Sequence, residues 1–400
     1  MKSFNFIVSI AFIYSYDAVH SEPEILHNDH FQIFDGRNTS GLVIKVRTTR
    51  SGKKMKLMKV IQCMVLILPG VLAGSSAEAD DGDPLFQDQS TLKVELSAPL
   101  STLVRERPET EELPGVFSYT NADGQRVELD MQIAARGNFR HRNCDFPPVT
   151  LNFRRSQLEG TLFDQQNKLK VVTHCKITRR YEQSVEREYL AYLLLNAMTP
   201  LSFRVRLLEV TWVDSEGRRP RMVRSAFLIE HKNRLAARIG MEEQEFAFTE
   251  VENIQPEQLN LASMFQYLIG NFDFSPTGGS NNECCHNYEM FGSAPDSLVA
   301  IPFDFDFAGI VNAPNAVPNS ERGVERVGQR VYHGYCVNND YVEGSISEFQ
   351  MARDTIYALV AGQQKLEPTV RENLARYVDG FYAVIDDTKA VQEKIIGSCK

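Results

Sequence analysis

One short stretch alternates two aspartates with three phenylalanines, Phe303-Asp304-Phe305-Asp306-Phe307. If Ile301–Gly309 is an extended strand, the phenylalanines point to one face and the aspartates to the other. Carboxylates two residues apart on a strand lie roughly 7 Å apart, so against an apolar layer they repel each other and lose hydration. A divalent cation relieves both costs, and Mg²⁺ favours one or two carboxylates plus phosphate oxygens. The stretch therefore indicates a magnesium site, with a strand whose acidic face is merely solvated as the alternative.

The segments before this stretch bring further polar residues in an informative order. A helix is expected over residues 256–269, opened by a proline and closed by Gly270. Asp273 follows it in a loop, Asn287 lies downstream, and the apolar run 298–301 leads into the acidic stretch. Phosphoryl transfer uses such a set: an Asp to receive the hydroxyl proton, an Asn and an Asp to hold Mg²⁺, and a Lys for the ATP phosphates.

The first half of the chain is expected to be a β-rich lobe with one helix. Apolar residues at helical spacing predict that helix over 181–198, and it carries Glu188. Lys168 and Lys170 share one face of a short strand. Residues from 347 to the end are expected to be mainly helical. Alternation and turn residues predict the strands over 92–96, 116–120, 127–135, 149–153, 169–172, 205–213 and 222–230.

Several motifs, taken in order, resemble those of the spore-coat CotH kinase family, and more distantly HipA-like and protein-kinase-like folds. The resemblance spans roughly residues 92–311. The matching segments are Ala135-Arg136-Gly137-Asn138 (the family's RGN element), Glu188-Tyr189-Leu190-Ala191-Tyr192 (a helix ending in LAY), Ala226-Phe227-Leu228-Ile229-Glu230 (a strand ending in LxE), Tyr267-Leu268-Ile269-Gly270-Asn271-Phe272-Asp273 (GNxD) and Phe303-Asp304-Phe305-Asp306 (WDFD).

The resemblance implies a role for each matched residue. Asp273 would be the catalytic-loop aspartate, and Asn287, Asp304 and Asp306 would bind the metal. Either Lys170 or Lys168 would reach the ATP phosphates. The remaining nucleotide-site residues would be Glu188, which would position that lysine, Arg136, which would lie near the nucleotide, and Glu230. The implied cofactors are ATP and Mg²⁺, with Mn²⁺ as the alternative metal.

The sequence also departs from the kinase pattern. The segment between Asp273 and Asn287 is long and contains Gly278-Gly279-Ser280-Asn281-Asn282, so Asn281 or Asn282 could be the metal ligand instead. No Gly-rich GxGxxG loop precedes the lysine strand. Each residue also has a structural alternative, because an Asp after Gly-Asn can be a turn former and a lysine pair can be the solvated face of an edge strand.

Composition and the amino terminus limit the class of protein. The net charge of −9 argues against a nucleic-acid-binding surface. A basic cluster, an apolar run over 60–73 and small residues precede an acidic segment, which is typical of a secretory signal peptide over 55–79. We interpret residues 1–54 as an upstream extension arising from start-site choice. Apart from Cys63, which falls in the signal, six cysteines form an even set that suggests disulfides in an exported protein.

These observations predict an α+β, two-lobed protein-kinase-like fold, with a β-rich lobe over 85–245 and a mainly helical lobe over 246–400. The expected function is an exported atypical kinase that transfers phosphate from ATP–Mg to a protein hydroxyl, in the periplasm or outside the cell. No nucleic-acid partner and no transmembrane segment in the mature chain are expected. A non-catalytic adhesion protein with a degenerate kinase-like fold is the alternative. Less favoured is a metal-dependent hydrolase built on Asp273, His286, Asp304 and Asp306.

Overall fold

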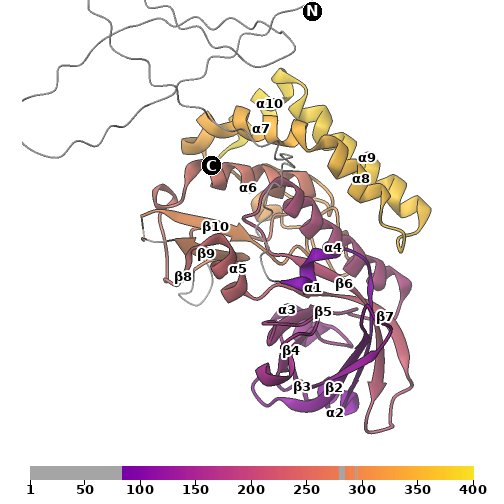
Figure 1. The fold of residues 1–400 in the computed structure, drawn as a ribbon. Helices are drawn as coiled ribbons and strands as arrows, with labels where there is room; N and C mark the ends of the chain where they lie inside the picture. The colour runs from indigo at the N-terminus through magenta and orange to yellow at the C-terminus, as the bar shows by residue number, and fades with distance from the viewer. Residues whose placement is uncertain (1–82, 279–283, 293, 295) are drawn as a thin grey trace, which may run out of the picture. The chain divides into compact units, whose positions relative to one another are not determined.

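The computed structural model describes residues 83–400 except 279–283, 293 and 295. The upstream extension over 1–54, the signal peptide over 55–79 and the alternative ligands Asn281 and Asn282 lie outside these residues. The described chain is α+β, and its strand-rich first half and largely helical second half follow each other in sequence (Figure 1).

The first half is built around a closed seven-stranded barrel in the order β1-β2-β3-β4-β5-β7-β6. Parallel pairing of β1 with β6 closes it, and the other neighbours are antiparallel. Alternation explains the strands, since β4 buries every second residue and sends its apolar side chains inward. The strands are β1 (Leu92–Ala98), β2 (Leu113–Thr120), β3 (Arg126–Ala135), β4 (Val149–Phe153), β5 (Lys168–Val172), β6 (Val205–Asp214) and β7 (Met222–Ile229).

Closure of the barrel leaves no free sheet edge and encloses a core of its own. Phe117 and Phe163 meet edge to face at 5.1 Å between ring centroids, and Trp212 is fully buried. Three short helices precede or connect the barrel strands: α1 (Pro84–Gln87), α2 (Leu100–Glu106) and α3 (Phe139–Asn143). The expected strands are all confirmed, but a barrel closed on itself was not expected, because non-local pairing of β1 with β6 leaves no local pattern.

Helix α4 (Arg179–Met198) packs between the barrel strands β6 and β7 and the carboxyl-terminal helices. Its apolar stripe, which includes Leu190 and Leu194, is buried in the larger core together with Phe265 of α6. The chain leaves the helix at Thr199, and Pro200 prevents its continuation. The helix predicted over 181–198 is thus confirmed, and it begins two residues earlier.

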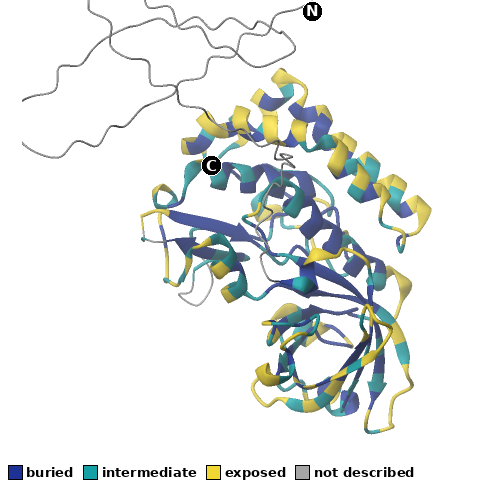
Figure 2. Cartoon of the chain, viewed as in Figure 1, coloured by how far each residue is buried: buried dark blue, intermediate teal, exposed yellow. Residues whose placement is uncertain are grey.

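The second half combines a small sheet with helices. The sheet has the order β10-β9-β8 and was not expected in a mainly helical lobe. Buried positions concentrate on β9, β10, α4 and α6, while the outer helices expose one side (Figure 2). The elements are α5 (Lys232–Ile239), β8 (Glu242–Gln244), α6 (Pro256–Ile269), β9 (Tyr288–Gly292), β10 (Leu298–Pro302), α7 (Val342–Met351), α8 (Arg353–Ala361), α9 (Pro368–Ile385) and α10 (Thr388–Lys394).

The acidic stretch is not a strand, which corrects the expectation for Ile301–Gly309. Strand β10 ends at Pro302, and Asp304 adopts a left-handed backbone conformation with φ 57°. The three phenylalanines consequently go to separate places rather than forming one layer. Phe303 faces Phe203, Phe305 packs on Tyr192 and Phe265, and Phe307 packs on Phe139.

The chain after this turn is fastened to the end of α6. Backbone amides of Gly309 and Ile310 donate to the carbonyls of Gly270 and Ile269 at 3.0 and 2.9 Å. A Cβ atom at Gly309 would come within 2.7 Å of the Cα of Gly328, so only glycine fits this approach. The end of α6 and the acidic stretch are therefore held side by side.

All six cysteines of the described chain pair at disulfide distance: Cys144 with Cys175, Cys284 with Cys285, and Cys336 with Cys399. The suggestion of disulfides is confirmed to this extent. Cys284 and Cys285, neighbours in the segment before Asn287, pair with each other. Among the described residues, no helix is both long enough and apolar enough to span a bilayer.

Candidate active site

A cavity of about 410 Å³ opens between the barrel half and the second half. The barrel half contributes the segment from Arg136 to Arg140, and the second half contributes the loop after α6, the segment before β9 and the acidic stretch. Five of the nine sequence-predicted site residues line this one cavity: Arg136, Asp273, Asn287, Asp304 and Asp306.

Asp273 is positioned by the turn that ends α6. Gly270 caps the helix with φ 63°, and the side chain of buried Asn271 accepts a hydrogen bond of 3.1 Å from the backbone N–H of Asp273. The carboxylate Oδ1 lies 2.7 Å from Nε2 of His286. The hydrogen bond to Asp273 raises the pKa of His286, and the charges of Asp273 and Asp304 raise it further. Asp273 is thus a fixed carboxylate paired with a readily protonated imidazole.

Asn287 ties this carboxylate to the acidic stretch. Its Nδ2 donates to the backbone carbonyl of Asp273 at 2.7 Å and to Oδ2 of Asp273 at 3.3 Å. Its own carbonyl accepts from the backbone N–H of Phe303 at 3.1 Å. Asn287 has φ 55°, a left-handed conformation that Asn tolerates better than most residues. It therefore holds two loops in register, whether or not it also binds a ligand.

Asp304 stands at the electrostatic centre of the cavity. Its backbone N–H donates to the hydroxyl of buried Tyr192 on α4 at 2.9 Å. No hydrogen bond or ion pair engages its carboxylate within the described part of the chain. The charged and polar groups that interact electrostatically with it come from both halves: Arg136, Arg140, Lys170, Glu188, Tyr192, His286 and Asp306.

Arg140 joins Asp306 to helix α4. Its Nε lies 2.7 Å from Oδ2 of Asp306, and its Nη2 lies 2.5 Å from Oε2 of Glu188. Both carboxylates are almost fully buried, and burial raises the pKa of each. One guanidinium cannot fully neutralise Glu188, Asp306 and the nearby Asp304 at once. Arg136 is a second guanidinium beside Glu188 and Asp304, so three carboxyl groups share two guanidinium groups at this point, which would favour an added cation.

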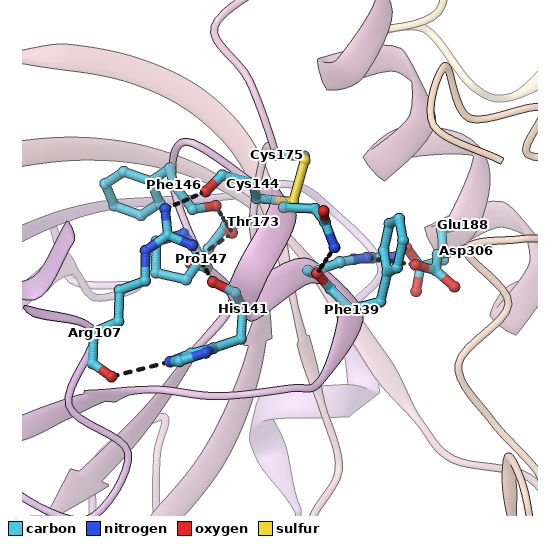
Figure 3. The surroundings of a disulfide bond; sticks show 12 residues. Arg107, Phe139, His141, Cys144, Phe146, Pro147, Thr173, Cys175, Glu188 and Asp306 are labelled. Carbon is cyan, nitrogen blue, oxygen red and sulfur yellow. Dashed lines mark hydrogen bonds and ion pairs between the residues drawn. A yellow bond between two sulfur atoms is a disulfide. The ribbon is translucent and has the colours of Figure 1, made fainter. Parts of the chain in front are cut away.

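A disulfide fixes the segment that carries Arg140 (Figure 3). Cys144, directly after α3, is bonded to Cys175, which lies between β5 and α4. On the other side, the guanidinium of Arg107 donates to the carbonyls of His141 and Cys144, the latter at 2.7 Å. The disulfide and Arg107 together anchor the part of the chain that directly follows Arg140.

Lys170 and Glu188 are arranged differently from the expectation. Glu188 pairs with Arg140, whereas the ammonium of Lys170 lies 4.0 Å from Glu289 and 5.3 Å from the ring centroid of Phe303. Burial lowers the pKa of Lys170, and the charge of Arg136 lowers it further. Lys170 thus borders the cavity through Phe303, but Glu188 does not position it.

Two predicted residues lie elsewhere. Lys168 is exposed and lines a separate cavity with His231 and Arg234. Glu230 is buried and accepts hydrogen bonds of 3.0 and 2.8 Å from Arg238, so it fastens α5 to the end of β7. Neither lines the cavity that contains Asp273.

The carboxylates of Asp304 and Asp306 suit a metal ion that takes its remaining ligands from a bound phosphate or water. Among the described residues, no group of three or more His, Cys, Asp or Glu side chains is arranged to hold a metal. Asp304 and Asp306 offer two carboxylates, which is the usual protein share for Mg²⁺ bound together with phosphate oxygens.

Sequence reasoning missed Arg140, His286 as the partner of Asp273, and Glu289 as the partner of Lys170. Arg140 lies four residues after Arg136, so the sequence shows two arginines flanking Gly137-Asn138-Phe139. No local pattern indicates the two carboxylate partners of Arg140. Asp306 is 166 residues away.

No protein-family model matches the chain, and no curated protein matches it at a significant level. The likeness to the CotH kinase family therefore rests on the motifs quoted above.

Proposed function

We propose that this protein is an exported, CotH-like atypical kinase that transfers the terminal phosphate of ATP–Mg to a protein hydroxyl. The observation that carries the proposal is the convergence of Asp273, Asn287, Asp304 and Asp306 on one cavity. These residues are spread over a helix-ending loop and two further segments, and a purely structural role does not require them to meet.

The reaction assigns one task to each of these side chains. The acceptor hydroxyl oxygen attacks the γ-phosphorus, the bond from that phosphorus to the bridging oxygen breaks, and ADP leaves with the electron pair. The carboxylate of Asp273 receives the hydroxyl proton, and its hydrogen bond to His286 orients it. Asp304 and Asp306 would hold Mg²⁺, which supplies positive charge for the phosphate oxygens. Arg136 and Lys170 add fixed positive charge beside it.

Export is part of the proposal, and the three disulfide-distance cysteine pairs support it. A specific observation favours a second candidate, the non-catalytic surface protein. Arg140 already engages Asp306, and the barrel contains no Gly-rich loop at its lysine strand. A metal-dependent hydrolase receives less support, because His286 is paired with Asp273 rather than grouped with other metal-binding side chains.

Incubation of the purified protein with γ-labelled ATP and Mg²⁺ tests the proposal, with the protein itself and a mixed protein extract as acceptors. We expect transfer by the wild type and a loss of about 10²- to 10⁴-fold in Asp273→Asn, since a general base contributes about that much. The control is Asp123→Asn, an exposed turn residue that should keep full activity. No label on any acceptor with the wild type would favour the non-catalytic candidate.

A further inference from the structure

A second cavity of about 490 Å³ adjoins the first and shares three of its lining residues, Phe139, Asp273 and Phe307. The carboxylate-bearing loop after α6 therefore borders both cavities. The other lining residues of the second cavity are Phe272, Val317, Pro318, Asn319, Ser320 and Glu321.

The two cavities differ in chemistry. The first is lined by arginines, aspartates and a histidine. In the second, the described lining residues include no Lys, Arg or His, and apolar side chains form about half of the wall. The charged groups that a polyphosphate would meet among these lining residues are the carboxylates of Asp273 and Glu321, so the second cavity suits a neutral or cationic occupant with an apolar group.

Two apolar residues at this cavity remain exposed to solvent, and packing within the protein gives no reason for their exposure. Phe139 meets Phe307 edge to face at 5.2 Å between ring centroids, and yet 37% of Phe139 remains exposed. Val317 is 63% exposed. Exposed apolar groups that gather around a hollow next to a charged site are typical of ligand-binding surfaces.

We propose that this second cavity is the acceptor subsite, and that it takes a peptide in which a large apolar residue adjoins the hydroxyl-bearing residue. The proposal rests on the proposed kinase function. An acceptor hydroxyl must reach Asp273 from the side opposite the leaving group. With Arg136, Asp304 and Asp306 lining the first cavity, the second is the approach to Asp273 that leaves the phosphate side free. The neighbouring side chain of the acceptor then lies against Phe139, Phe307 and Val317.

Equilibrium binding of fluorescent peptides tests the subsite without requiring activity. The probes are Gly-Gly-Ser-Phe-Gly-Gly and Gly-Phe-Ser-Gly-Gly-Gly, each compared with the same peptide carrying Ala for Phe. We expect one of the Phe peptides to bind the wild type about tenfold or more tightly than its Ala counterpart, because a large apolar side chain becomes buried. Val317→Asp should abolish this preference. Val337→Asp is the matched control, since Val337 is 61% exposed and lines neither cavity.

Phosphate transfer to the same peptides separates the two proposals. Selective binding that depends on Val317, without any transfer, would support the cavity as a peptide site and overturn the kinase function. Transfer that shows no preference for Phe would support the kinase function and overturn the subsite. Equal binding of Phe and Ala peptides, or the same loss in Val317→Asp and Val337→Asp, would also overturn the subsite.

Discussion

At the scale of single residues, the site is organised by pairings between charged groups rather than by any one motif. Arg140 contacts Asp306 and Glu188, His286 contacts Asp273, and Asp304 keeps its carboxylate clear of protein partners in the described chain. The ion pairs with Arg140 oppose the burial that raises the pKa values of Asp306 and Glu188.

Replacement of Arg140 by Met should destabilise the protein by about 3–5 kcal/mol, because it leaves two buried carboxylates without their cation. Burial already raises the pKa values of Asp306 and Glu188. Their folded-state pKa values then lie above the unfolded ones, so the variant is most stable at low pH and loses stability as pH rises through the folded values. Urea unfolding at pH 5 and pH 8 measures this. Arg142→Met, an exposed change on the same helix, should have little effect, and equal losses in the two variants would contradict the pairing.

At the scale of elements, sequence patterns predicted what is local. Helix α6 was predicted at its observed bounds because a proline opens it and Gly270 closes it, and every barrel strand was found from alternation. The stretch around Asp304 was predicted wrongly, since alternating Phe and Asp reads as a strand although Asp304 turns the backbone into the left-handed region. Chain order suggested that the loops holding Asp273, Asn287 and Asp304 meet, and the structure places the three residues at one cavity.

Pairings between distant elements could not be predicted. Glu188 was expected to position a lysine, and instead it meets Arg140 from a short helix that sequence analysis did not identify. Such contacts depend on how the barrel closes and where α4 packs on it. Neither leaves a periodic signal in the residues concerned.

The disulfide between Cys144 and Cys175 makes a testable claim about the element that carries Arg140. The Cys144→Ser, Cys175→Ser variant opens a link across a separation of 31 residues and should lose about 3–4 kcal/mol of stability by the loop-entropy model. It should also bind Mg-ATP more weakly, because α3 is released next to Asp306. Isothermal titration and urea unfolding report the two effects.

The control removes the other long-range disulfide, between Cys336 and Cys399 across a separation of 63 residues. That variant should lose a similar amount of stability and keep its affinity for Mg-ATP, since no residue close in sequence to Cys336 or Cys399 lines the cavity, whereas Arg140 lies four residues before Cys144. If both double variants changed nucleotide affinity equally, the effect would come from general destabilisation.

At the scale of the whole molecule, one core fills the barrel, and a larger core packs residues of β5, β6, β7 and α4 against the second half. Charged groups are concentrated where the loops of the two halves meet. One buried histidine couples the barrel half to pH. His174 is fully buried and stacks on Phe146 at 5.0 Å between ring centroids. Burial lowers the pKa of His174 to about 4, and the charge of Arg224 acts in the same direction.

The unfolded chain therefore binds a proton at this residue between about pH 6.5 and pH 4, whereas the folded chain does not. Stability must fall as pH falls through this range. His174→Leu should reduce that slope by up to about 1.4 kcal/mol per pH unit, which corresponds to one proton. Urea unfolding at half-unit steps of pH gives the two slopes, and identical slopes would mean that His174 is accessible to protons in the folded protein.

The central claim is that the cavity around Asp304 holds a magnesium-bound nucleotide, and calorimetric titration with Mg-ATP tests it most directly. The account predicts saturable binding to the wild type and to Asp354→Ala, an exposed control, and a loss of tenfold or more (about 1.4 kcal/mol) in Asp304→Ala. Binding by Asp304→Ala that equals the wild type, or no binding by a folded wild-type protein, would contradict it.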